Sequence, residues 1–323
     1  MPIRSTRNLE SYYDRFSYSG AGGPERVDQH YGGRGIIFGG GNSNVIQYIT
    51  IQSTGNSTDF GDLNQNANWS AGTSSGGAGR AVKAGGSSQH TNMDYVTVAS
   101  TSNATDFGDL YEPMREFAGC SNVTRGVFGG GYAQDSSSFD VMQYITIATT
   151  GNSTDFGNAS SVWTANGCSN GTRGTWMGGY NGGNSRNTQI DYVTLSTTSN
   201  TSDFGDLSYS CYAPGGAVGN SPSDDDRGIY MGGASPQYGS SNTVSMSYIT
   251  ISTTGNGTDF GDLVSASYIS GAQNDGSRGV QCGTGSSNVM QYFAIGTSGK
   301  AQDFGDLLSG ASGFTAMGNS SGD

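Results

Sequence analysis

One hexapeptide, TDFGDL, returns in similar form along most of this 323-residue chain. Its central Asp-Phe-Gly occurs six times, at spacings of 47, 49, 48, 56 and 44 residues. A period of about 40–50 residues is typical of the blades of a β-propeller. Before any other property is considered, the repeat therefore indicates a ring built from six similar units.

Three further signals recur in phase with this motif. In each unit an Arg followed by Gly or Ala comes first, glycines follow it, and a Tyr-led alternating run such as YITI comes next. The six arginines are Arg34, Arg80, Arg125, Arg173, Arg227 and Arg278. Each unit therefore predicts four short strands, which bury their apolar faces by packing blade on blade.

The ends of the repeat predict how the ring closes. The chain ends 20 residues after Asp303, which is the distance at which the Arg of a further unit would be expected. The last segment, SGASGFTAMGNSSGD, has the pattern of a fourth strand that lacks a unit of its own. We therefore expect an all-β fold, a six-bladed propeller over residues 34–323, closed by the carboxy-terminal strand on the unit of Arg34. Residues 1–33 would form an extended arm outside the ring.

The order of these signals resembles the kelch β-propeller repeat, with Phe60 and its equivalents where kelch repeats usually carry Trp. The pattern YITIATTGNSTDFGDL is similar to repeats in structural proteins of marine tailed phages, including phages of cyanobacteria. The resemblance covers residues 34–323 and implies a virion component, present in multiple copies on a particle that assembles in the host cytoplasm. Propellers serve many functions, so the fold alone does not assign one.

Six copies of Asp-Phe-Gly argue against catalysis by any one of them. A kinase would use this Asp to hold magnesium, but the chain lacks the accompanying lid, Lys and His-Arg-Asp signals. We assign the Asp to backbone or Arg hydrogen bonds at a turn, the Phe to packing between blades, and the Gly to close approach. The structural positions are Asp59, Phe60, Asp106, Phe107, Asp155, Phe156, Asp203, Phe204, Asp259, Phe260, Asp303 and Phe304.

Composition excludes several functions and leaves others open. The formal net charge is −12, all of it outside residues 1–33, and this disfavours nucleic acid as a partner. No stretch approaches the roughly 18–20 apolar residues of a membrane span, and the amino terminus lacks the apolar segment of a secretory signal. We expect four reduced cysteines, no metal, no cofactor and no enzymatic activity. The run Asp224–Asp226 is read as a solvated loop, with an ion site as the alternative.

Differences between the repeats are the better guide to binding. Between the glycines and the repeat Tyr, the six loops hold 6, 8, 12, 12, 14 and 6 residues, so the third to fifth are long. Equivalent loops emerge on one rim, and Tyr with amide side chains suits recognition. The candidate residues are Tyr132, Asp135, Tyr180, Asn181, Gln237 and Tyr238. Solvated loops without a ligand are the alternative.

Residues 1–33 combine aromatic and Arg side chains that suit docking onto another chain. The candidates are Arg7, Tyr12, Tyr13, Arg15, Phe16 and Tyr18. We predict a non-enzymatic virion structural protein, anchored by this arm to other proteins of the capsid or tail. The propeller would be displayed on the particle and would contact a glycan or protein of the host surface. The alternative is a cellular or secreted carbohydrate-binding propeller, which needs carboxylates or aromatic residues that converge over the central channel.

Overall fold

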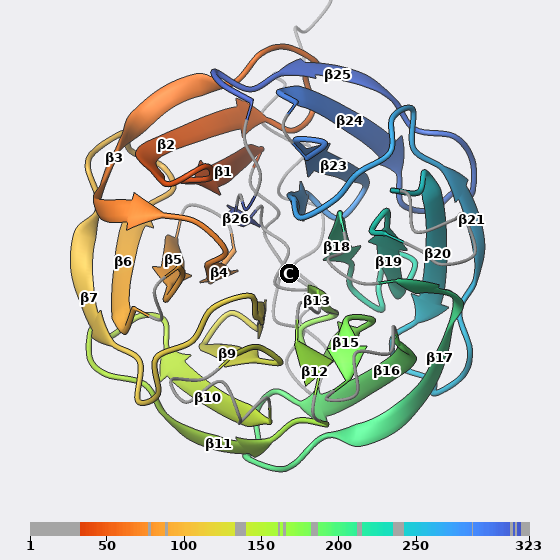
Figure 1. Ribbon diagram of the computed structural model, residues 1–323, viewed down its shortest axis with the longest axis horizontal. Coiled ribbons are helices and arrows are strands. Elements are labelled where there is room, and N and C mark those ends of the chain that lie inside the picture. Colours follow the sequence, from red (N-terminus) through yellow and green to blue (C-terminus); the bar gives the residue numbers. More distant parts are fainter. Residues whose placement is uncertain are drawn as a thin grey trace, which may run out of the picture.

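The computed structural model shows a ring of β-sheets around a central axis (Figure 1). It describes residues 33–76, 79–87, 90–132, 140–160, 162–163, 166–181, 187–211, 215–234, 242–285, 287–310, 313 and 315–317. Within these residues the secondary structure consists of strands and turns, without a helix. The predicted docking residues of the arm, from Arg7 to Tyr18, lie outside the described residues.

Six four-stranded antiparallel sheets form the blades. From the innermost to the outermost strand, the blades are as follows: blade one, β26 (Thr315–Met317), β1 (Arg34–Phe38), β2 (Ser43–Thr50) and β3 (Thr58–Ala67); blade two, β4 (Ala71–Ser74), β5 (Arg80–Ala84), β6 (Asn92–Thr97) and β7 (Thr105–Asp109); blade three, β8 (Ala118–Ser121), β9 (Arg125–Gly129), β10 (Val141–Thr146) and β11 (Thr154–Asn158); blade four, β13 (Asn166–Ser169), β14 (Arg173–Met177), β16 (Asn187–Thr194) and β17 (Ser202–Cys211); blade five, β18 (Gly216–Gly219), β19 (Arg227–Met231), β20 (Ser245–Thr250) and β21 (Thr258–Asp262); blade six, β22 (Gly271–Asn274), β23 (Arg278–Cys282), β24 (Val289–Ala294) and β25 (Gln302–Asp306). A separate pair, β12 (Val162–Trp163) and β15 (Tyr180–Asn181), forms a two-stranded sheet.

The carboxy-terminal strand closes the ring, as the sequence predicts. β26 pairs antiparallel with β1, and its register joins Ile36 to Met317 and Phe38 to Thr315. Blade one is therefore built from both ends of the repeat region, and the strand lies near the centre of Figure 1. The prediction of a six-bladed propeller with this closure is confirmed.

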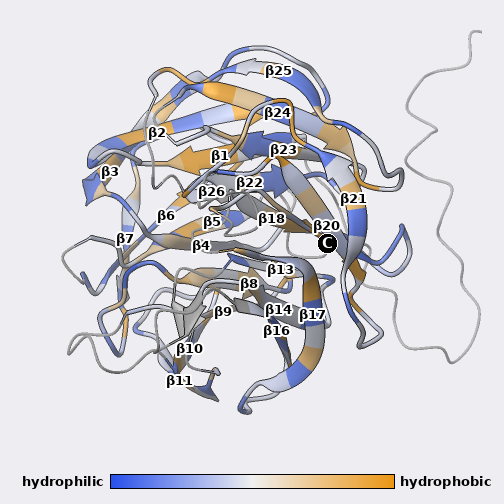
Figure 2. Ribbon diagram, turned by 45° about the vertical axis from the view of Figure 1, so that its right-hand side comes forward, coloured by the Kyte–Doolittle hydropathy of each residue, from blue (hydrophilic) through white to orange (hydrophobic). Residues whose placement is uncertain are grey.

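The apolar core is divided among the boundaries between blades. Six clusters of buried side chains each join two neighbouring blades, including the boundary between blades six and one. In the first cluster, Ile36 and Phe60 of blade one pack with Val96 of blade two. Figure 2 shows hydrophobic residues along strands such as β1 and β2 and hydrophilic residues at the ends of β3. Each blade thus depends on its neighbours for burial.

The Asp-Phe-Gly motif lies in the outermost strand of each blade and forms a β-bulge. In blade one the register passes from Ile46 opposite Gly61 to Gln47 opposite Asp59, so Phe60 is the extra residue. The six motif glycines have φ between +132° and +146°, a region that only glycine adopts easily. A Cβ on Gly61 would lie 2.4 Å from the carbonyl oxygen of Ser102 in the next blade. The glycine is therefore required by both its conformation and its contact.

The repeated arginines hold neighbouring blades together, so of the two partners expected for the motif aspartates, backbone or Arg, the Arg is engaged elsewhere. Each guanidinium lies 4.3–4.7 Å from the ring centre of its own blade's Tyr. Each also donates to a backbone carbonyl of the next blade, as Arg34 does to Val98 at 2.8 Å and Arg278 to Ile51 at 3.1 Å. The first Asp of every motif is exposed on a strand instead of lying in a turn.

Asparagines in the outer hairpins also join the blades. Asn56, Asn103 and Asn152 each begin an Asn-X-Thr triplet, and Asn suits a turn. The Asn103 Oδ1 accepts a hydrogen bond of 3.0 Å from the backbone N–H of Asp62 in the preceding blade, and Asn152 does the same for Asp109. Asn56 repeats this contact with Asp306 across the closure. These asparagines therefore serve the contact between blades.

Candidate functional site

One rim of the ring carries the strand ends that border the long loops and the entrance to the centre. Because strands in a blade alternate in direction, the loop after the second strand and the connection from the outermost strand to the next blade emerge on the same side. We call this side the crossover rim. It includes the loop 39–42 and the connection 68–70, whereas the outer hairpins such as 51–57 lie on the opposite rim.

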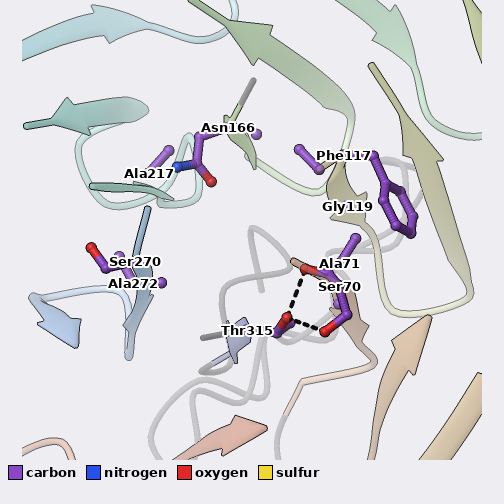
Figure 3. A pocket seen from close by; sticks show the side chains of 13 residues that line it. Ser70, Ala71, Phe117, Gly119, Asn166, Ala217, Ser270, Ala272 and Thr315 are labelled. Carbon is purple, nitrogen blue, oxygen red and sulfur yellow. Dashed lines mark hydrogen bonds between the residues drawn. The ribbon is translucent and has the colours of Figure 1, made fainter. Parts of the chain in front are cut away.

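A small cavity of about 70 Å³ lies where the inner strands begin. Its lining is made of neutral and mostly small residues from several inner strands, among them Ser70, Asn166, Ser270 and Thr315 (Figure 3). The hydroxyls of Ser70 and Thr315 lie 2.6 Å apart, and Thr315 also donates to the Ser70 carbonyl. The cavity has room for a few water molecules and offers no charged group for catalysis.

Among the residues that the structure describes, backbone hydrogen bonds link four of the connections around this entrance. Two residues before the inner strand, the chain adopts a left-handed conformation in four connections, at Trp69 (φ 56°), Glu116 (φ 56°), Ile269 (φ 44°) and Gly313 (φ 73°). The N–H of Glu116 donates to the Trp69 carbonyl, that of Trp69 to Gly313, and that of Gly313 to Ile269. The bulky Trp69 is strained in this region, and such strain is often found at functional sites.

An aromatic and Arg stack lies on the crossover rim between blades two and three. The Arg115 guanidinium lies 4.8 Å from the ring centre of Tyr132 and 5.9 Å from that of Trp69. Backbone bonds in both directions join Arg115 to Tyr132. This approach depends on Gly131, since a Cβ there would lie 2.6 Å from the Arg115 carbonyl oxygen. We call Trp69, Arg115 and Tyr132 the rim stack.

The carboxyl group of Glu116 accompanies the rim stack. It lies 3.9 Å from an Arg115 Nη1, and its side chain is 16% exposed. Burial raises the pKa of Glu116 above its ordinary value, and the nearby Arg115 partly offsets this effect. The stack therefore places the Arg115 cation beside a carboxyl group that burial makes harder to ionise.

The predicted recognition residues have different outcomes. Tyr132 belongs to the rim stack. Tyr180 and Asn181 form β15, whose backbone pairs with Trp163 and Val162 of the preceding connection. The described first residues of these two loops thus pair with equivalent connections. Asp135, Gln237 and Tyr238 lie outside the described residues.

Sequence reasoning missed Trp69 and Arg115. A signal was nevertheless present, because six of the eight arginines in residues 34–323 occupy the repeat position and Arg115 does not. Residues that break a repeat are not explained by what every blade needs. Applied to the connections as well as to the loops, the same argument would have found Arg115.

A buried ionisable pair lies within blade two. Lys83 and Asp94 are cross-strand partners, and each is 1% exposed. Burial lowers the pKa of Lys83 to about 8, against an opposing effect of Asp94, and burial raises the pKa of Asp94. Asn64 donates a hydrogen bond of 2.6 Å to the Asp94 carboxylate. Perturbed pairs of this kind also occur at active sites, but this one is enclosed by the strands of the blade.

Other chemical sites find little support in the described residues. There, no group of three or more His, Cys, Asp or Glu side chains is placed to hold a metal ion. Asp226 accepts a hydrogen bond of 2.7 Å from Asn170 and one of 3.0 Å from the N–H of Ser252, so it joins blades four and five. The four cysteines are free and buried. None of the described segments is a helix of the length and apolarity needed to cross a membrane.

The fold and the rim define a six-bladed β-propeller. No protein-family model matches the chain, and no curated protein matches it. The solved structure of YjhT is similar with a TM-score of 0.65, over 84% of this chain and 94% of the YjhT chain, at 10% sequence identity. At that identity the similarity shows the fold alone.

Proposed function

We propose that this chain is a non-enzymatic structural protein of a phage particle, whose propeller binds a partner through the crossover rim. The observation that carries the binding role is the rim stack. Its Arg115, Trp69 and Tyr132 bring together three side chains that the repeat does not require. Aromatic and Arg residues are the types most often found at the energetic centre of interfaces.

The distinction between repeated and unrepeated residues supports this assignment. The repeated Arg, Tyr, Phe and Gly positions are occupied by contacts within and between blades. Trp69 is different, since its ring lies over the Arg115 guanidinium and both residues stand outside the repeat. Its left-handed backbone is shared with Glu116, Ile269 and Gly313 at equivalent positions, so that conformation belongs to the connections between blades. A binding role gives the contact between Trp69 and Arg115 a reason that blade packing does not.

The phage assignment is carried by the resemblance of the repeat to phage structural proteins, and the anchoring role by the composition of residues 1–33. Mass spectrometry of purified particles tests it, and we expect the chain among the virion proteins. Deletion of residues 1–33 should leave a folded propeller that no longer joins the particle. If the chain is missing from particles, the virion role is wrong. If the truncated chain still joins particles, docking uses the ring.

A cellular or secreted carbohydrate-binding propeller is the second candidate. The rim stack favours it too, because aromatic rings combined with polar groups are common in ligand sites. The central cavity does not, because its lining is small and neutral. Presence of the chain in host cells that carry no phage would favour this candidate over the virion protein.

A further inference from the structure

We propose that the rim stack is a binding subsite for an acidic saccharide, in which the Arg115 guanidinium receives the carboxylate of a uronic acid. This inference deepens the proposed binding function of the crossover rim and rests on it. It names the chemical class of the ligand and the residue that recognises its charge.

Among the arginines of the described residues, Arg115 differs from the others in the partners of its guanidinium. Six of the seven donate from Nη1 to a backbone carbonyl at 2.8–3.3 Å while stacked on a Tyr. Arg115 is also stacked, yet within the described part of the chain its guanidinium makes no hydrogen bond, and its Nε is buried without a partner. The side chain is 30% exposed. The Glu116 carboxyl lies 3.9 Å from Nη1, which is beyond hydrogen-bond distance, so the guanidinium donors are available to a ligand.

In the described residues, two polar atoms near Arg115 also lack hydrogen-bond partners. Among the described residues, the Trp69 Nε1 and the Asn68 Oδ1 are buried without a hydrogen-bond partner. Leaving such buried groups unpaired is unfavourable, because they have lost their hydrogen bonds to water. Together with the Arg115 Nε, the cluster has two unpaired donors and one unpaired acceptor. A ligand with both hydroxyl and carboxylate groups would complement this set after a small adjustment of the side chains.

The Arg115 guanidinium is held in place before any ligand binds. Tyr132 and Trp69 lie against it, and the backbone of Arg115 is bonded to that of Tyr132. Gly313 leaves the space that the Trp69 side chain occupies, since a Cβ there would lie 2.8 Å from the Trp69 Cδ1. A fixed planar guanidinium binds a carboxylate through two parallel hydrogen bonds with little loss of side-chain entropy.

A saccharide fits these groups better than an acidic peptide. A single sugar ring offers hydroxyl donors for Asn68 Oδ1, hydroxyl acceptors for the Trp69 N–H, and an apolar face for the aromatic rings. A Glu or Asp side chain of a peptide supplies the carboxylate for Arg115 but neither hydroxyls nor a ring. The chain's net charge of −12 opposes any anionic ligand at long range, so recognition must come from these local contacts.

The test measures binding of the full chain to an array of uronic-acid oligosaccharides, their neutral methyl esters and a tetraglutamate peptide. Affinity for any uronate that binds is then compared in four variants. Arg115→Gln should weaken binding about tenfold or more, because a charge-assisted pair is lost. Arg115→Lys keeps the charge but loses the planar fork, and Trp69→Phe keeps a ring but loses the N–H. Both should weaken binding severalfold. Lys300→Gln, an exposed change on the opposite rim with the same loss of charge, should leave affinity unchanged.

Thermal unfolding shows whether each variant is folded. If Arg115→Gln does not fold, the affinity of Arg115→Lys decides whether Arg115 binds the carboxylate. The proposal is wrong if no uronate binds, if the methyl esters bind equally well, if only the tetraglutamate peptide binds, or if folded Arg115 variants keep wild-type affinity. In those cases detection of the chain in purified particles would still support the virion role. The two proposals therefore fail separately.

Discussion

Replacing one motif glycine by alanine should loosen a boundary between blades. Gly108 has φ +132°, and a Cβ there would lie 2.6 Å from both the carbonyl carbon and oxygen of Gly151 in the next blade. Since this neighbour is backbone, relief requires the hairpin of blade three to move away. That movement stretches the 2.7 Å bond from the Gly151 N–H to the Phe107 carbonyl and the 2.9 Å bond from Ser153 to Asp109.

The expected loss of stability follows from these two effects. A non-glycine residue in this backbone region costs about 1–3 kcal/mol, and each weakened hydrogen bond costs about 0.5–1.5 kcal/mol. Gly108→Ala should therefore lower the free energy of unfolding by about 2–6 kcal/mol. For a chain of this size the thermal midpoint should fall by about 3–9 °C.

Calorimetry and urea unfolding measure this difference. The matched control is Gly255→Ala, in the outer hairpin of blade five, where a Cβ would meet nothing within 4 Å. That variant should have wild-type stability or slightly more, because alanine reduces the freedom of the unfolded chain. If Gly108→Ala and Gly255→Ala unfold at the same temperature, the motif glycine is not needed for the approach of the blades and the reasoning is refuted.

Three further predictions concern the ring. Phe107→Ala, at a side chain that is 1% exposed, should lower the free energy of unfolding by about 3–5 kcal/mol, and an unchanged guanidinium midpoint would contradict its place in the core. Deleting residues 311–323 removes β26 and exposes the edge of β1, so cooperative unfolding and the monomer peak in gel filtration should be lost; a compact truncated ring would show that β26 is dispensable. Lys83→Met made together with Asp94→Asn should raise the free energy of unfolding by about 1–3 kcal/mol at pH 7, because the buried pair is removed as a whole, no carboxylate is left buried without its cation, and the new Asn still offers an acceptor to Asn64. Because the unfolded wild-type chain binds more protons between pH 8 and the ordinary Lys pKa of 10.5, wild-type stability should rise over that range relative to the double variant, and parallel pH profiles would contradict the lowered pKa of Lys83.

The arithmetic of the repeat was sufficient to predict the architecture. Six in-phase copies gave the number of blades, and the segment after Asp303 gave the closing strand that pairs with Ile36 to Phe38. Apolar residues at two-residue spacing gave the strands, and Phe60 was assigned to the packing between blades. These features could be predicted because the same local pattern serves the same purpose in every unit.

The sequence alone could not assign partners across the blade boundaries. The motif aspartates were expected to accept from backbone or Arg donors, whereas Arg34 donates to the Val98 carbonyl of the next blade. The Asn103 side chain suits a turn, yet it accepts from Asp62 of the preceding blade. Each of these contacts depends on the angle at which two blades meet, and that angle leaves no periodic trace in the chain.

The rim stack shows most clearly which contacts the sequence predicts and which depend on how the blades meet. Tyr132 could be chosen from the sequence because its loop is long, whereas Trp69 and Arg115 come from two connections with no shared pattern. They meet because consecutive connections enter the ring side by side, bonded from Glu116 to Trp69, and because the loop of Tyr132 lies against Arg115. Repetition in the sequence therefore determined the ring, while the side-by-side packing of its blades determined which unrepeated side chains share a surface.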